Sequence, residues 1–140
     1  MKTIIKKKKT ISEKDNLILL CNKKSNLSDF NLTQAELKYI KNKLKKSEEI
    51  ININQYGRFI SVVVPKKEKN KNHHYENVRI LGDKLLSTFS SEKSVLIIDV
   101  EKKNTEVLLL AEGLALSNYT FTKHKTDPKA NKLKTVFMCK

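Results

Sequence analysis

Two short runs of consecutive apolar residues constrain the fold of this 140-residue chain more than any other feature. Residues 17–21 read LILLC, and residues 94–100 read SVLIIDV. A strand that is apolar on both faces must lie inside a sheet that is covered on both sides. A chain of this length is long enough to bury such a core within one domain, so we treat residues 1–140 as a single domain.

The first part of the segment between these two runs, up to residue 64, predicts one helix and one hairpin. Thr33 and Glu36 have the spacing of a capping box, which predicts the start of an amphipathic helix that extends to about Lys46. The β-branched runs at 50–53 and 59–64 then predict a hairpin. Its turn contains Gly57, which is able to take a positive φ.

The second half of the chain is predicted to hold two helices and a strand. After a polar run, Lys66 to His74, which predicts a solvated loop, helical spacing begins at Tyr75 and continues to about Ser90. Gly82 inside this helix predicts close packing against a neighbouring backbone. A nearly all-apolar helix is expected at about 105–120, and a half-exposed strand at 133–138.

Strands that alternate with helices predict an α/β domain. We expect a mixed sheet flanked by helices on both faces, with the hairpin supplying the antiparallel part. No element is assigned to residues 1–9, which are basic and are followed by charged residues rather than by the apolar core of a secretory signal. The longest apolar stretch falls far short of the ~20 residues that a membrane span needs.

The net charge of +14 raises the question of a polyanionic partner. Of the 29 basic residues only Arg58 and Arg79 are arginine, whereas readers of phosphate and bases favour the planar guanidinium group. The charge pattern therefore favours a solvated lysine-rich surface, and nucleic-acid binding is kept as the alternative. Cys21 is expected to be a buried thiol and Cys139 to lie near a mobile chain end, which fits a cytoplasmic protein.

Candidate reactive groups are few. The adjacent residues His73 and His74 point in different directions and lack further metal ligands nearby in the sequence. The three glycines are isolated from one another, which argues against a phosphate cradle and against an ADP-ribose-like ligand. Glu112 is expected to face Arg79 or the rim of its helix, as a structural ion pair rather than a catalytic group.

One longer pattern resembles a known family. Glu112 and Gly113, then Tyr119, Phe121 and Lys125, follow the order found at the end of the N-terminal domain of the cytosolic leucyl aminopeptidases. The preceding helix resembles the same family in its E-x-x-R-x-x-G run, which here consists of Glu76, Arg79 and Gly82.

The resemblance implies a macro-like, three-layer fold and a non-catalytic scaffold role. The parent enzymes are hexamers that release N-terminal residues, preferentially leucine, with two divalent ions (Zn, Mn or Mg). The ligands of these ions belong to a C-terminal domain, so the resemblance implies no catalytic residue, metal ligand or cofactor in this chain. Its expected partners are that catalytic domain and the sister subunits of a homohexamer. Tyr119 and Phe121 are expected either to pack at the end of the helix or to contact another domain or subunit.

Overall fold

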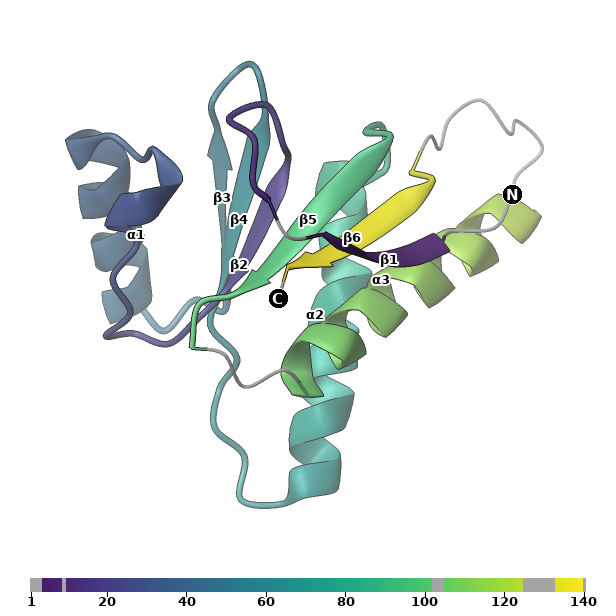
Figure 1. Cartoon of the computed structure of the whole chain (residues 1–140). Coiled ribbons are helices and arrows are strands. Elements are labelled where there is room, and N and C mark those ends of the chain that lie inside the picture. Colours follow the sequence, from purple (N-terminus) through teal and green to yellow (C-terminus); the bar gives the residue numbers. More distant parts are fainter. Residues whose placement is uncertain (1–3, 9, 102–104, 125–132, 140) are drawn as a thin grey trace.

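A mixed six-stranded sheet forms the middle layer of the molecule (Figure 1). The computed structural model describes residues 4–8, 10–101, 105–124 and 133–139. The strand order is β1-β6-β5-β2-β4-β3, with every neighbouring pair parallel except β3 and β4. The strands are β1 (Ile4–Lys8), β2 (Leu17–Leu20), β3 (Ile50–Asn54), β4 (Phe59–Val63), β5 (Ser94–Asp99) and β6 (Thr135–Cys139).

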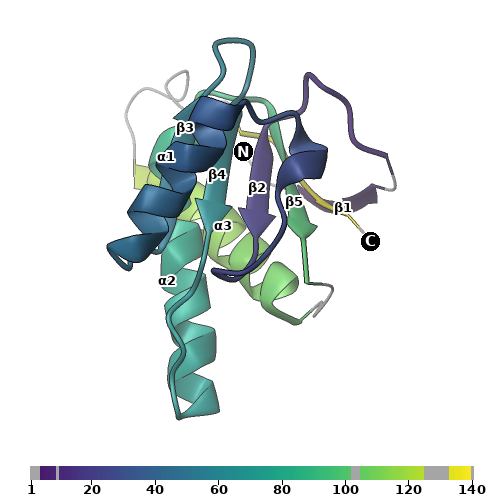
Figure 2. The ribbon, with the colours of Figure 1, turned by 90° about the vertical axis from the view of Figure 1, so that its left-hand side faces the viewer.

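Helices cover both faces of this sheet, which confirms the predicted three-layer α/β fold. Helix α1 (Gln34–Lys45) lies on one face, and α2 (Lys71–Phe89) and α3 (Thr105–His124) lie together on the other (Figures 1 and 2). A short 3-10 helix, η1 (Ser28–Phe30), precedes α1.

The alternation of side chains in β2 explains its apolar sequence. Ile18 and Leu20 belong to the core beneath α2 and α3, whereas Leu17 and Leu19 belong to the core beneath α1. All four side chains are almost fully buried. The prediction of a central strand is therefore confirmed, because both faces of β2 meet a helical layer.

The capping box of α1 is also confirmed. The Thr33 hydroxyl accepts the backbone N–H of Glu36 at 3.1 Å, and the Glu36 carboxylate accepts the backbone N–H of Thr33 at 2.9 Å. The same carboxylate accepts a hydrogen bond from the Gln55 side chain at 2.9 Å. The start of α1 is thereby attached to the turn of the β3–β4 hairpin.

Three elements differ from the sequence prediction: β1 was not predicted, α2 starts earlier than expected, and α3 ends at His124 rather than near residue 120. Residues 4–8 form β1, which pairs with β6, although only Ile5 packs against the core beneath α2 and α3. One inward apolar side chain among lysines is too weak a pattern to predict a strand. Helix α2 starts at Lys71 rather than Tyr75, because the Asn70 side chain accepts the N–H groups of Asn72 and His73 and so caps a polar first turn.

The hairpin itself is confirmed, but its turn is not built as expected. The residue with positive φ is Tyr56, at 66°, and Gly57 has an ordinary φ. The Asn54 side chain accepts the backbone N–H of Tyr56 at 2.8 Å, which favours this tight turn. Tyr56 is 97% exposed, so the cost of its positive φ comes from its own Cβ atom and not from packing of its ring.

Helices α2 and α3 cross in backbone contact at two glycines. A Cβ atom on Gly82 would lie 2.5 Å from the carbonyl oxygen of Leu110, and one on Gly113 would lie 2.3 Å from that of Arg79. Real Cβ atoms do not approach backbone atoms so closely. The packing predicted for Gly82 is confirmed, and Gly113 supplies the matching contact from α3.

We expect Gly113→Ala to lower the free energy of unfolding by roughly 1–3 kcal/mol or more, because the added methyl group forces the two helices apart. Helix propensity alone would predict the opposite sign, since alanine is favoured over glycine by ~1 kcal/mol in a helix. Urea titration followed by circular dichroism measures this change. Gly57→Ala is the control: nothing lies within 4 Å of its added Cβ, so stability should be unchanged or slightly raised. Equal effects at both glycines would contradict this account of the crossing.

Candidate functional site

Five of the residues that carry the family resemblance lie at the α2–α3 crossing. Arg79 Nε lies 3.9 Å from Glu112 Oε2, and Arg79 Nη1 lies 3.5 Å from Glu76 Oε2. Gly82 and Gly113 form the backbone contact beside these ion pairs. The partner expected for Glu112 is therefore present. Since about half of each side chain in the Arg79–Glu112 pair is exposed to water, the pair itself adds little stability.

The remaining residues of the family pattern are only partly described. Tyr119 and Phe121 lie within α3, but their side chains are outside the described part of the structure. Lys125 is outside the described residues altogether. The contact role expected for the two aromatic residues therefore stays a prediction.

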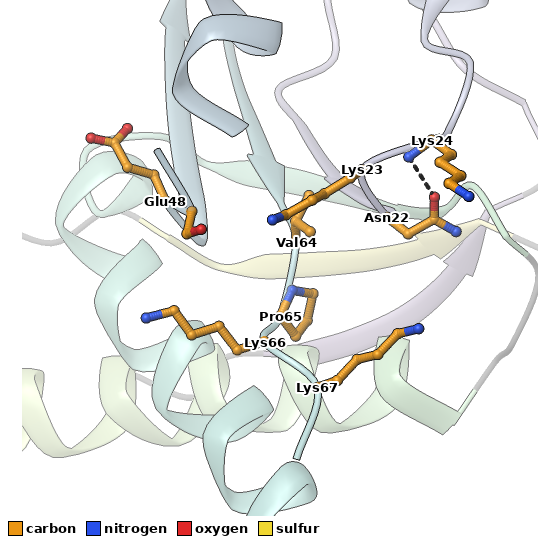
Figure 3. A pocket seen from close by; sticks show the side chains of 9 residues that line it. Asn22, Lys23, Lys24, Glu48, Val64, Pro65, Lys66 and Lys67 are labelled. Atoms are coloured by element: carbon orange, nitrogen blue, oxygen red, sulfur yellow. Dashed lines mark hydrogen bonds between the residues drawn. The ribbon is translucent and has the colours of Figure 1, made fainter. Parts of the chain in front are cut away.

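A hollow lies at the carboxyl end of the sheet, where Figure 3 shows it from close by. It has a volume of about 620 Å³ and opens between the segments that follow β2 and β4 and the turn that precedes β3. In sheets of this kind ligands bind beyond the carboxyl ends of the strands. We call this hollow the lysine pocket; it is lined by Asn22, Lys23, Lys24, Ser47, Glu48, Val64, Pro65, Lys66 and Lys67.

Four lysines surround the lysine pocket, against one carboxylate. In Figure 3, Lys23 and Lys66 extend toward the side where Glu48 lies, whereas Lys24 and Lys67 extend to the other side. The four ammonium groups thus frame the opening in two pairs rather than converging on one point. Such a frame suits an extended polyanion better than a single small anion, because each lysine acts as a separate point charge.

Glu49 fixes the backbone of Lys66 at the lysine pocket. The Glu49 carboxylate accepts the Lys66 backbone N–H at 3.0 Å and the Asn77 side-chain amide at 2.9 Å. Burial by itself would raise the pKa of Glu49, but these hydrogen bonds outweigh it and hold the pKa below its ordinary value. The charged carboxylate therefore connects the start of β3 to the segment between β4 and α2.

The sequence did not single out these lysines, because they lie about forty positions apart in two segments that look like solvated loops. The sequence nevertheless contained one useful signal, which is their position: each pair comes shortly after a predicted strand, at 17–21 or at 59–64. Adjacent parallel strands end at the same edge, so segments that follow them come together.

A second, smaller crevice lies between the carboxyl ends of β2 and β5. It has a volume of about 30 Å³, close to the size of one water molecule, and is lined by Asp99, Glu101 and Glu106 together with residues 20–22. Glu106 pairs with His74 Nε2 at 2.6 Å, which joins the first turns of α2 and α3. Within the described residues no cluster of three potential metal ligands is present.

Cys21 is one of the residues that line this crevice. Burial raises the pKa of its thiol from 9.0 to about 12, the negative charge of Glu101 adds to this rise, and a hydrogen bond from Ser25 opposes it. Cys21 is only 7% exposed, which confirms the predicted buried thiol. It is therefore protonated and unreactive at neutral pH.

In a Cys139→Ser variant, we expect a disulfide reagent at pH 8 to modify Cys21 more slowly than in the urea-unfolded chain by roughly tenfold or more, since burial lowers the thiolate fraction and also blocks the approach of the reagent. Absorbance of the released thiol follows the reaction. Because the folded state keeps a proton that the unfolded state loses, the free energy of unfolding should also fall as the pH rises from 9.0 toward about 12. Rapid labelling of the folded protein would contradict the burial of this thiol.

No known family profile matches the chain. Acetylglutamate kinase from Geobacter metallireducens is 25% identical to it over 112 residues, which cover 77% of this chain and 38% of the kinase. A mutant of tomato leucine aminopeptidase has a similar structure, with a TM-score of 0.59 and 13% identity over 99% of this chain and 32% of that enzyme. The chain therefore spans 38% of the length of the kinase and 32% of the length of the aminopeptidase. The structural likeness establishes a shared fold over nearly all of this chain.

Within the described ranges, no helix is both long and apolar enough to cross a bilayer.

Proposed function

We propose that this chain is a non-catalytic scaffold domain of a protein related to the leucine aminopeptidases. The observation that carries the proposal is the α2–α3 crossing, where Arg79, Gly82, Glu112 and Gly113 come together. These residues carry the family resemblance in the sequence, and in the structure they hold two helices together. Their arrangement indicates that this sequence pattern is needed for the packing of α2 against α3.

The shared fold supports the same proposal. Nearly the whole chain superposes on about a third of tomato leucine aminopeptidase, a relation expected for one domain of a larger enzyme. In this proposal a metal-bearing domain supplies the two divalent ions and removes N-terminal residues from peptides. The present chain packs against that domain and takes part in contacts between subunits, and the protein works in the cytoplasm.

The proposal predicts that the purified chain does not hydrolyse leucine p-nitroanilide above the buffer rate, with or without added Mn²⁺, as measured by p-nitroaniline absorbance. An antibody raised against the chain should nevertheless precipitate metal-dependent hydrolysis of this substrate from the source cells, because the catalytic domain is bound to the scaffold. Chelation of the metal should abolish the precipitated activity, and a non-immune antibody is the control. Turnover by the purified chain, or a precipitate without activity, would refute the proposal.

The lysine pocket favours a second candidate function, the binding of a nucleic-acid backbone. Four ammonium groups lie around one hollow, in a chain with a formal net charge of +14. Lysines suit non-specific contacts to phosphates, which need charge rather than a planar hydrogen-bonding group. A single-stranded backbone that passes through the opening would meet both pairs of lysines.

If this second function is present, oligonucleotide affinity should fall steeply with salt. The double variant Lys23→Gln, Lys66→Gln should reduce the slope of log K against log salt by roughly 0.7–0.9 for each lost phosphate contact. Fluorescence anisotropy at several salt concentrations measures the slope. The control is the double variant Lys93→Gln, Lys134→Gln. It removes the same charge from exposed positions just before β5 and β6, at the amino ends of these strands, and should leave the slope nearly unchanged. Equal losses in both double variants would show diffuse attraction without a site.

A further inference from the structure

The two edge strands of the sheet differ in how they are protected from pairing with another strand. Strands β1 and β3 lie at opposite margins of the sheet (Figure 2). β1 has the sequence IIKKK, whose lysines discourage the approach of a further strand, whereas β3 has the sequence IININ and carries no charge. Proteins commonly protect an open edge with lysine, proline or a bulge, and β3 has neither lysine nor proline.

The hydrogen-bond pattern shows which groups of β3 face outward. At its two ends, the Val64 N–H donates to the Glu49 carbonyl at 2.8 Å, and the Gln55 N–H donates to the Arg58 carbonyl at 3.0 Å. Bonding alternates along an antiparallel pair, so the odd-numbered residues 49–55 bond to β4 and residues 50, 52 and 54 point the other way. The N–H and C=O groups of these three residues have no hydrogen-bond partner among the described residues.

We propose that β3 pairs with β3 of a second copy of this chain, in an antiparallel register centred on Asn52. The second copy's Asn52 then lies opposite Asn52, and its Asn54 lies opposite Ile50. Each copy contributes three outward N–H groups and three outward C=O groups, which makes six backbone hydrogen bonds in all. The two sheets become one continuous sheet.

The features of the strand itself favour a second copy as the occupant. The register is self-complementary, since every outward donor meets an outward acceptor of an identical strand. No like charges stand opposite one another, because residues 50–54 are neutral. On the α1 face, Ile51 lies opposite Ile53 of the second copy, but both side chains are already almost fully buried beneath α1. The pairing therefore depends on the backbone hydrogen bonds rather than on newly buried apolar surface. This inference goes beyond the proposed function and does not depend on it.

The net charge opposes this pairing and supplies a test. Two copies that each carry +14 repel one another, and added salt screens that repulsion. Sedimentation velocity of the wild-type chain should therefore show a dimer whose dissociation constant decreases as NaCl increases. The binding of a polyanion has the opposite salt dependence, so the two processes are distinguished.

Substitutions at the centre of the register test the geometry. Asn52→Lys and Asn52→Asp each place like charges opposite one another, so each variant should dimerise roughly tenfold more weakly than the wild type. An equimolar mixture of the two variants should regain association, because the introduced lysine of one copy faces the introduced aspartate of the other. Asn72→Lys, at an exposed position at the start of α2, adds the same charge as Asn52→Lys and is the control for net charge. The Asn52 side chain accepts a hydrogen bond from the Ser61 hydroxyl, and Asn52→Asp keeps an oxygen acceptor for that bond.

Circular dichroism of each variant is the test of folding, and it distinguishes a loss of association from a loss of structure. The inference is overturned if the wild-type chain stays monomeric at high protein and salt concentrations. It is equally overturned if Asn52→Lys weakens the dimer no more than Asn72→Lys does, or if the mixture associates no better than the separate variants.

Discussion

The contact between the backbones of α2 and α3 is the constraint on which much of this structure depends. Gly82 and Gly113 allow the two helices to cross without side chains between them. The pair therefore forms one close-packed layer, which shares a core with side chains of β2, β4, β5 and β6. The crossing also fixes where the first turns of the two helices meet, and His74 and Glu106 form their pair there. The close packing of α2 against α3 thus determines where the His74–Glu106 pair lies, near the carboxyl ends of β2 and β5.

Charge is unevenly distributed over that edge. The lysine pocket lies beside β4, while Asp99, Glu101 and Glu106 line the crevice between β2 and β5. The protein is therefore not a uniformly positive body, although the formal net charge is +14. Local arrangement, more than net charge, decides where an anion is attracted and where another copy can approach. The neutral strand β3 is the clearest case, since it provides an uncharged margin in a basic protein.

Sequence patterns predicted the elements whose signals are local. The apolar run of β2, the capping box at Thr33 and the β3–β4 hairpin each depend on neighbouring residues, and all three were found. Strand β1 was missed because its pairing with β6 joins segments more than a hundred residues apart. The turn was predicted with the wrong residue, because an Asn54 side-chain hydrogen bond, and not glycine, supports the positive φ of Tyr56.

The same division holds for function. The sequence alone determined the fold class, the buried character of Cys21 and the residues that resemble the leucyl aminopeptidases, because hydrophobic periodicity and short motifs are written in consecutive positions. Only the tertiary structure decided that Gly82 and Gly113 face one another and that lysines from two segments surround one pocket. It also decided that the outward groups of β3 have no partner within the described part of the chain. These features depend on which helices and strands are neighbours. That arrangement is set by packing of the whole chain and not by any local pattern.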